Sequence, residues 1–220
     1  MFGMVESLDE DERQRRLRLE LNVQQFWQLR ASGPSLKLLI GATLAFADLG
    51  YYGTSTRAIA TRAGMSATAV YIHFSSKEEL FGHISESVHR AALEQMVEAD
   101  NSTARPTERL RAVSLALATF HAQLSVMIRT VHYDLRALPD EHFKSIAKIR
   151  RDIDGHLREI LVAGMETGEF DISDLPGTSL MILSASVDLG RWFRESETRT
   201  PLSIGMQYSN LALKLAGAAR

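Results

Sequence analysis

The chain has 220 residues, a formal net charge of −2 and no cysteine, with 45% hydrophobic and 24% charged residues. This composition fits one or two folded domains, and it excludes disulfides, thiolate metal sites and a broad basic surface. No apolar stretch reaches the roughly 20 residues that cross a bilayer, and the amino terminus is acidic, unlike a signal peptide. We therefore expect a cytoplasmic protein with no membrane partner.

The first predicted element is a helix within residues 5–31. Its sequence is rich in helix-forming Glu, Arg, Leu and Gln, and acidic residues precede arginines, as the helix dipole favours. Its leucines alternate with a period of two, however, which is typical of a strand. We predict a charged helical extension over residues 1–33. Two alternatives stay open: a partly ordered arm with no specific role, or a helix that docks on a partner subunit or reaches toward a ligand.

The next predicted helix covers residues 35–49, where apolar residues recur at helical spacing. Ser35 is expected to cap its start, and Gly50 to end it. The sequence YYGTS at 51–55 is expected to be a loop.

Two short helices around Gly64 have the pattern of a helix-turn-helix, with Ser55 and Ser66 as expected N-caps. The second is too short to be stable alone, so neighbouring helices must hold it, which leaves its outer face free. About nine residues give roughly 13 Å of helix, and the major groove of B-DNA is about 12 Å wide. The pattern therefore predicts a DNA-reading helix, with a purely structural helical hairpin as the alternative.

The residues expected to face the bases combine hydrogen-bonding groups with small apolar groups that suit a thymine methyl. They are Thr68, Ala69, Tyr71, Ile72 and His73. The residues expected to contact phosphate lie mostly near helix starts, where exposed N–H groups favour anions. They are Ser55, Arg57, Tyr71 and Lys77.

Residues 42–80, ATLAFADLGYYGTSTRAIATRAGMSATAVYIHFSSKEEL, resemble the amino-terminal domain of the TetR/AcrR family of transcriptional regulators. The resemblance implies that the positions above contact a double-stranded operator, that the protein is a homodimer, and that a carboxy-terminal helical domain binds a small-molecule effector. Two departures matter: Ala58 replaces the acidic residue that often completes the cap with Ser55, and Ala67 and Ala69 leave fewer donors for base edges. The operator sequence is therefore left open.

The remaining chain shows only helical patterns, with linkers or loops at 100–106 and 169–177. The fold class is therefore all-α, with a helix-turn-helix DNA-binding domain at 34–82 and a larger ligand-binding and dimerisation domain at 83–220. Apolar residues of the last two helices are expected to form the dimer interface. They are Leu180, Met181, Leu183, Val187, Ile204, Tyr208, Leu211 and Leu215.

Two segments mix apolar residues with a few polar groups, as a ligand cavity requires. The candidate ligand-binding residues are Met127, Arg129, His132, Tyr133, Asp188, Arg191 and Trp192. The alternative for Trp192 is a core or dimer contact. The ending after Gly190 resembles regulators of lipid and sterol catabolism, which implies an effector of the acyl-CoA or lipid class.

The seven histidines are scattered along the sequence, and residues 86–89 form a single Glu-x-x-His. Helical di-iron sites need two such motifs, so we expect no metal and no cofactor. No nucleophile elbow, phosphate loop or dinucleotide fingerprint is present, so we expect no enzyme. The predicted function is a dimeric repressor released by a small hydrophobic effector. The alternatives are a helical carrier with a non-functional helix-turn-helix and a metal-dependent helical oxygenase.

Overall fold

The computed structural model describes residues 10–135, 138, 140–196 and 198–218, and helices are the only regular secondary structure within these ranges. The all-α prediction is confirmed. In chain order the helices are α1 (Glu10–Gln28), α2 (Gly33–Gly53), α3 (Thr56–Ala63), α4 (Ala67–His73), α5 (Lys77–Ala99), α6 (Pro106–Gln123), α7 (Ser125–Tyr133), α8 (Asp140–Glu166), α9 (Leu175–Trp192) and α10 (Pro201–Leu215).

Helix α1 confirms the helix expected within residues 5–31, and residues 5–9 lie outside the described ranges. Val23, Phe26 and Trp27 are buried at helical spacing. Leu17 and Leu21, two of the leucines that alternate with period two, are 55% and 54% exposed. The buried stripe, and not the alternating leucines, therefore sets the conformation.

The start of α2 differs from the expectation. Ser32 occupies the N-cap position and Pro34 lies in the first turn, so Ser35 is inside the helix and the expected Ser35 cap was wrong. Proline fits the first turn because no intrahelical partner exists there for its missing N–H. Gly50 kinks the helix, with φ 69° and ψ 170°, and residues 51–53 add a further turn where a loop was expected.

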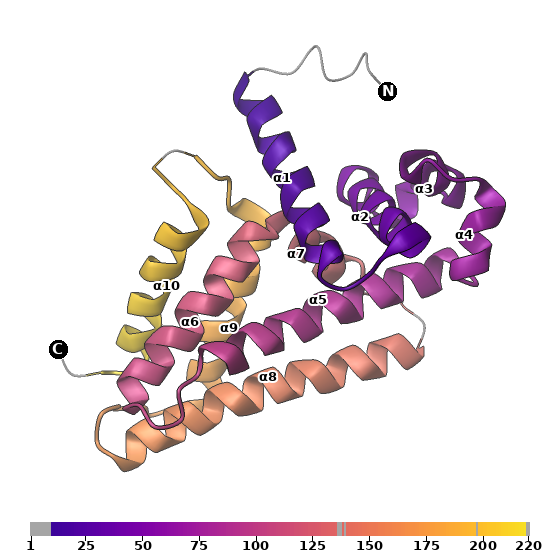
Figure 1. The fold of residues 1–220 in the computed structure, drawn as a ribbon. Coiled ribbons are helices and arrows are strands. Elements are labelled where there is room, and N and C mark those ends of the chain that lie inside the picture. The colour runs from indigo at the N-terminus through magenta and orange to yellow at the C-terminus, as the bar shows by residue number, and fades with distance from the viewer. Residues whose placement is uncertain (1–9, 136–137, 139, 197, 219–220) are drawn as a thin grey trace.

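The helices form two groups along α5, as Figure 1 shows. Helices α2, α3 and α4 lie at the amino-terminal end of α5, and α6, α9 and α10 lie toward its other end, while α8 runs beside α5. Gly82 of α5 abuts the His142 ring of α8, where a Cβ would overlap the ring. The boundary expected at residue 82 thus falls inside α5, which belongs to both groups.

Helix α1 contacts both groups. The indole N–H of Trp27 donates to Thr43 Oγ1 of α2 at 2.9 Å. The Asn22 side-chain amide donates to the carbonyl oxygen of Gln123, at the end of α6, at 2.9 Å. The described part of the amino-terminal extension is therefore packed into the fold and joins the two groups.

Several apolar side chains of α8, α9 and α10 are exposed. They are Val162, Met165, Leu180, Met181, Leu202, Met206, Leu211 and Leu215. Four of them, Leu180, Met181, Leu211 and Leu215, were expected at a dimer interface. Ile204, also expected there, is 2% exposed and packs with Phe193 in a small apolar cluster, so its interface role was wrong.

No single helix in the described ranges is long and apolar enough to cross a bilayer, and the one helix pair that reaches this length and apolarity, α6 with α7, is bent by 87°.

Candidate nucleic-acid interface and ligand cavity

The turn between α3 and α4 is fixed by local hydrogen bonds. The Ser55 hydroxyl accepts from the Ala58 N–H at 3.1 Å, and the Ser66 hydroxyl accepts from the Ala69 N–H at 3.2 Å, so both expected caps are confirmed. Gly64 has φ 66°, in the left-handed region that glycine occupies without a steric penalty. These features set the direction in which α4 leaves the turn.

Helix α4 has an inner and an outer face. Val70 is fully buried and Phe74, just after the helix, is half-buried against the core. Tyr71 and Ile72 are 55% and 76% exposed. Thr68 and His73 are also exposed and Ala69 is half-buried, so the predicted base-reading residues lie together on or beside the outer face. The outer face of this seven-residue helix is therefore accessible to a partner molecule.

Two side chains of α4 form exposed hydrogen bonds to neighbouring helices. The Tyr71 hydroxyl lies 3.3 Å from Thr56 Oγ1 of α3. His73 Nδ1 lies 3.2 Å from Ser35 Oγ of α2. The contacts with α3 and α2 restrict the orientations of the Tyr71 and His73 side chains before any ligand binds.

The predicted phosphate contacts differ in their surroundings. Ser55 and Arg57 are exposed at the start of α3. Lys77, by contrast, donates to the carbonyl oxygens of Tyr51 and Thr54, each at 3.0 Å, and its ammonium lies 4.1 Å from the Tyr51 ring centre. These contacts brace the start of α5 against the end of α2, and the phosphate role of Lys77 stays a prediction.

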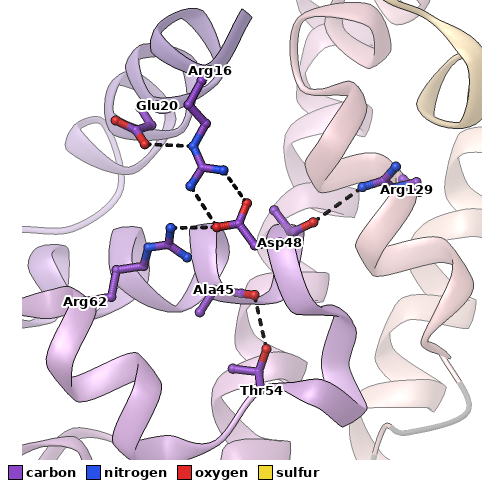
Figure 2. Close-up of polar contacts among 8 residues, drawn as sticks. Arg16, Glu20, Ala45, Asp48, Thr54, Arg62 and Arg129 are labelled. Carbon is purple, nitrogen blue, oxygen red and sulfur yellow. Dashed lines mark hydrogen bonds and ion pairs between the residues drawn. The ribbon is translucent and has the colours of Figure 1, made fainter. Parts of the chain in front are cut away.

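A charged network ties this region to α1 (Figure 2). Arg16 of α1 donates two hydrogen bonds to the Asp48 carboxylate of α2, at 2.6 and 2.7 Å, and Arg62 of α3 pairs with the same carboxylate at 2.6 Å. Burial pushes the Asp48 pKa upward, but the hydrogen bonds from Arg16 and Arg62 outweigh it and hold the pKa below its usual value. Three helices are thus joined through one carboxylate.

A cavity of about 620 Å³ lies among α5, α6, α7, α8 and α9. Its deep wall is largely apolar, with Val88, Ala92, Leu117 and Ile128 each at most 4% exposed. Its mouth carries exposed side chains, among them Tyr133, Leu180 and Arg191. Size and lining suit a small amphipathic ligand.

Three histidines that are far apart in the sequence converge on this cavity. His89 and His121 are 3% and 4% exposed, and the rings of His89 and His132 lie 4.8 Å apart. Burial is the main cause that lowers the pKa to about 4 for His89, about 3 for His121 and about 2 for His132. All three imidazoles are therefore neutral at pH 7.

The cavity lining includes four arginines and three aspartates. Arg158 pairs with Asp154 at 2.8 Å, and Arg191 pairs with Asp188 at 2.8 Å. Arg150 also lines the cavity, and it forms no ion pair with any described residue. Its guanidinium is exposed and available to an anionic group of a ligand.

Five of the seven predicted ligand residues line the cavity: Arg129, His132, Tyr133, Asp188 and Arg191. Met127 and Trp192 do not. Met127 is 1% exposed in the core, and Trp192 packs beside the small apolar cluster around Phe193. Met127 is next to Ile128 and Trp192 is next to Arg191, and both of these neighbours line the cavity. Because successive residues of a helix are rotated by about 100°, Met127 and Trp192 face away from the cavity.

Sequence reasoning missed the cavity residues on α5, α6 and α8. His121, Arg150 and Arg158 had no local pattern that marked them, and His89 was considered only as a metal ligand in the Glu-x-x-His motif. Glu86, the other half of the Glu-x-x-His motif, lies 3.5 Å from His142. Within the described ranges, no group of three or more histidine, aspartate or glutamate side chains is placed to hold a metal ion.

Two hydrogen bonds join the cavity helix α7 to α2. Arg129, which lines the cavity, donates to the Ala47 carbonyl oxygen at 3.4 Å, next to Asp48 (Figure 2). Asp134, just after α7, accepts from the Tyr51 N–H at 3.1 Å. The cavity wall and the helix that carries α3 and α4 therefore share direct contacts.

Comparison with known proteins gives matches in both halves of the chain. The family model for bacterial regulatory proteins of the tetR family matches residues 38–84, and that for the tetracyclin repressor-like C-terminal domain matches residues 103–216. A tetR-family regulatory protein from Rhodococcus RHA1 has 36% sequence identity and a TM-score of 0.82, over 86% of this chain and 100% of that chain.

Two further similar proteins are a repressor from Mycobacterium tuberculosis and a regulator from Bacillus subtilis. The transcriptional repressor KstR2 of Mycobacterium tuberculosis is 28% identical over 190 residues, which cover 84% of this chain and 92% of that protein. The structure of KstR2, described as a ketosteroid transcriptional regulator, has a TM-score of 0.74. The transcriptional regulator FadR of Bacillus subtilis, solved with stearoyl-CoA, has 21% identity and a TM-score of 0.66, over 84% of this chain and 100% of that chain.

Proposed function

Because the chain belongs to the tetR family of bacterial transcriptional regulators, we propose that it is a cytoplasmic, homodimeric repressor that binds operator DNA through α4. We further propose that a small effector in the cavity releases it from DNA. The observation that carries the DNA-binding role is the outer face of α4, where Tyr71 and Ile72 are exposed on a helix held by its neighbours.

In this proposal Thr68, Ala69, Ile72 and His73 face base edges, and Tyr71 faces a base edge or a phosphate. Ser55, Arg57 and Lys77 hold the phosphates beside them. Few donors reach the bases and the net charge of the chain is −2, so affinity depends on a small number of phosphate contacts and on DNA shape.

The effector proposed here has an apolar body and an anionic head, as in acyl-CoA thioesters and related lipid acids. This assignment is supported by the apolar deep wall and by Arg150, an exposed lining residue that forms no ion pair with any described residue. The stearoyl-CoA of the FadR structure has such an apolar body and anionic head, and the ketosteroid description of KstR2 also points to an apolar body.

The contacts between α7 and α2 offer a route for release. A ligand anion that draws the Arg129 guanidinium into the cavity competes with its hydrogen bond to Ala47. Movement of α7 also acts on the Tyr51 N–H through Asp134. The effector then favours the arrangement of α2–α4 in which the two recognition helices of a dimer miss successive grooves. The exposed apolar residues of α9 and α10 are the proposed dimer interface.

The test begins with an operator selected from genomic fragments, followed by fluorescence anisotropy at several salt concentrations. Ile72→Ala should weaken binding to the selected operator at least about tenfold. Val97→Ala, the same kind of truncation at a residue 52% exposed on α5, should change affinity less than about twofold. For Arg57→Gln, the slope of the logarithm of the binding constant against the logarithm of the salt concentration should become less steep by about 0.9.

A chain that retains ligand but shows no salt-dependent DNA binding would instead be a carrier with a non-functional helix-turn-helix. Equal affinities of the Ile72→Ala and Val97→Ala variants for the operator would remove α4 as the reading helix. Operator release by hexadecanoyl-CoA, monitored in the same assay, tests the effector class.

A further inference from the structure

The deep end of the cavity carries polar groups that an apolar ligand body does not need. His89 of α5 and His121 of α6 line it beside Val88, Leu117 and Ile128, and both histidines are at least 96% buried. A purely aliphatic chain would be held equally well by leucines at these positions. The hydrogen-bonding state of the two rings shows what they offer to a ligand.

The proton of His89 is on Nδ1. This atom lies 2.8 Å from the Ser85 carbonyl oxygen, which can only accept, so Nδ1 must be the donor. In the neutral ring, Nε2 then carries a lone pair. His89 Nε2 is buried and has no hydrogen-bond partner in the described ranges. A buried acceptor without a partner is unfavourable and is uncommon in folded proteins.

The proton of His121 is also on Nδ1. Its Nδ1 lies 3.2 Å from Ser186 Oγ of α9, and the Ser186 hydroxyl donates to the Leu183 carbonyl oxygen at 2.9 Å. Since the single hydroxyl proton is used there, Ser186 Oγ accepts from His121. His121 Nε2 is therefore a second lone pair, and burial keeps both rings neutral, with the pKa of His89 lowered to about 4 and that of His121 to about 3.

We propose that the effector carries a hydroxyl group on its apolar body, and that this hydroxyl donates to Nε2 of His89 or His121 while the anionic head lies at the mouth near Arg150. The inference rests on the proposed function and narrows its effector class to hydroxylated acyl thioesters or acids. A ketone at the same place would bring its lone pairs against those of the imidazoles. His89 cannot change tautomer without losing its bond to the Ser85 carbonyl oxygen, and His121 can do so only if the Ser186 hydroxyl gives up its bond to Leu183.

The test uses three thioesters that differ at one carbon: 11-hydroxydodecanoyl-CoA, 11-oxododecanoyl-CoA and dodecanoyl-CoA. Calorimetric titration of the full chain should give at least about tenfold tighter binding of the hydroxy compound than of either other compound. His89→Phe combined with His121→Phe should reduce this preference to less than about twofold.

The matched control is His83→Phe, on the same helix as His89 but outside the cavity lining, which should keep the preference. Circular dichroism checks that each variant is folded, and the comparison of three ligands on the unaltered chain tests the inference without any variant. Equal affinities, tightest binding of the oxo compound, or a preference retained in the double variant overturns the inference.

Operator release by the same three compounds separates this inference from the proposed function. If all three bind equally and all release the operator, the hydroxyl inference fails and the proposed function stands. If none binds and none releases the operator, the thioester class fails, and the inference fails with it.

Discussion

Replacing Asp48 by Asn should destabilise the chain markedly, because one carboxylate joins α1, α2 and α3. The Asp48 side chain is 21% exposed, and the side chains of Arg16 and Arg62 are 30% and 19% exposed. Asn keeps the shape but removes the charge, and it can turn an N–H₂ donor toward two other donors. Both arginines then keep positive charges close together without their shared anion.

The magnitude follows from the three short hydrogen bonds to this carboxylate. Breaking a fully buried ion pair costs about 3–5 kcal/mol, whereas an exposed pair contributes about 0–1 kcal/mol. The partial exposure of these groups places the loss between them, at about 2–3 kcal/mol. For a chain of this size, 1 kcal/mol moves the melting temperature by about 2–4 °C, so we expect a decrease of about 5–10 °C.

Thermal unfolding by circular dichroism at fixed protein concentration measures the effect. Asp152→Asn is the matched control, since Asp152 pairs with Lys148 at 2.6 Å on the surface, with side chains 42% and 70% exposed. This control should lower the melting temperature by less than about 2 °C. Equal melting temperatures of the two variants would refute the reasoning.

The pH dependence gives a second signature of the same carboxylate. Its folded pKa lies below the unfolded value, so its stabilisation is complete above the unfolded pKa of about 3.9 and is lost as pH falls through the folded pKa. The difference in unfolding free energy between the unaltered chain and Asp48→Asn should therefore shrink below about pH 4.

Three further changes test the structure. Gly64→Ala should lower the unfolding free energy by about 1 kcal/mol in a urea titration, because φ is 66° although no atom lies within 4 Å of the added Cβ. Burial keeps His89 and His121 neutral in the folded chain, whereas the same histidines bind protons below about pH 6.5 in the unfolded chain. The unfolding free energy should therefore fall from pH 7 to pH 5. This decrease should be smaller when both histidines are replaced by Phe. Trp27→Phe should cost about 1–3 kcal/mol in a urea titration, because it removes the buried hydrogen bond to Thr43.

The glycine and tryptophan changes each have a matched control in the chain. Gly155→Ala, in the interior of α8 with open space around the added Cβ, should raise the unfolding free energy by about 0.5–1 kcal/mol. Trp192→Phe, at a half-buried position, should cost less than Trp27→Phe. The glycine argument is contradicted if the Gly64→Ala chain is as stable as the Gly155→Ala chain. The tryptophan argument is contradicted if Trp192→Phe and Trp27→Phe lower the unfolding free energy equally. The histidine argument is contradicted if the unfolding free energy is the same at pH 7 and pH 5.

The amino-terminal extension has a larger part in the fold than its charged sequence indicates. Trp27 reaches α2, Asn22 reaches the end of α6, and Arg16 pairs with Asp48. Helix α1 therefore lies across the same junction as the α7–α2 contacts that we propose transmit effector binding. The period-two pattern does not predict this packing, because it includes the exposed Leu17 and Leu21 and leaves out the buried Phe26 and Trp27.

The sequence by itself determined the features that depend on neighbouring residues. The caps at Ser55 and Ser66, the left-handed Gly64 and the outward face of α4 all follow from preferences that act within one or two turns. For this reason the helix-turn-helix and the positions on it could be read directly. The Ser35 cap was wrong because Pro34 lies inside the first turn, so the N-cap is Ser32, three residues earlier.

Only the tertiary structure decided which distant residues meet. His89, His121 and His132 lie on three helices, and their convergence depends on how α5, α6 and α7 pack around an unfilled volume. The same holds for Asp48, whose pairing with Arg16 and Arg62 spans three helices. Helical periodicity gives the face on which a side chain lies, but the partner opposite that face is set by packing between elements far apart in the chain.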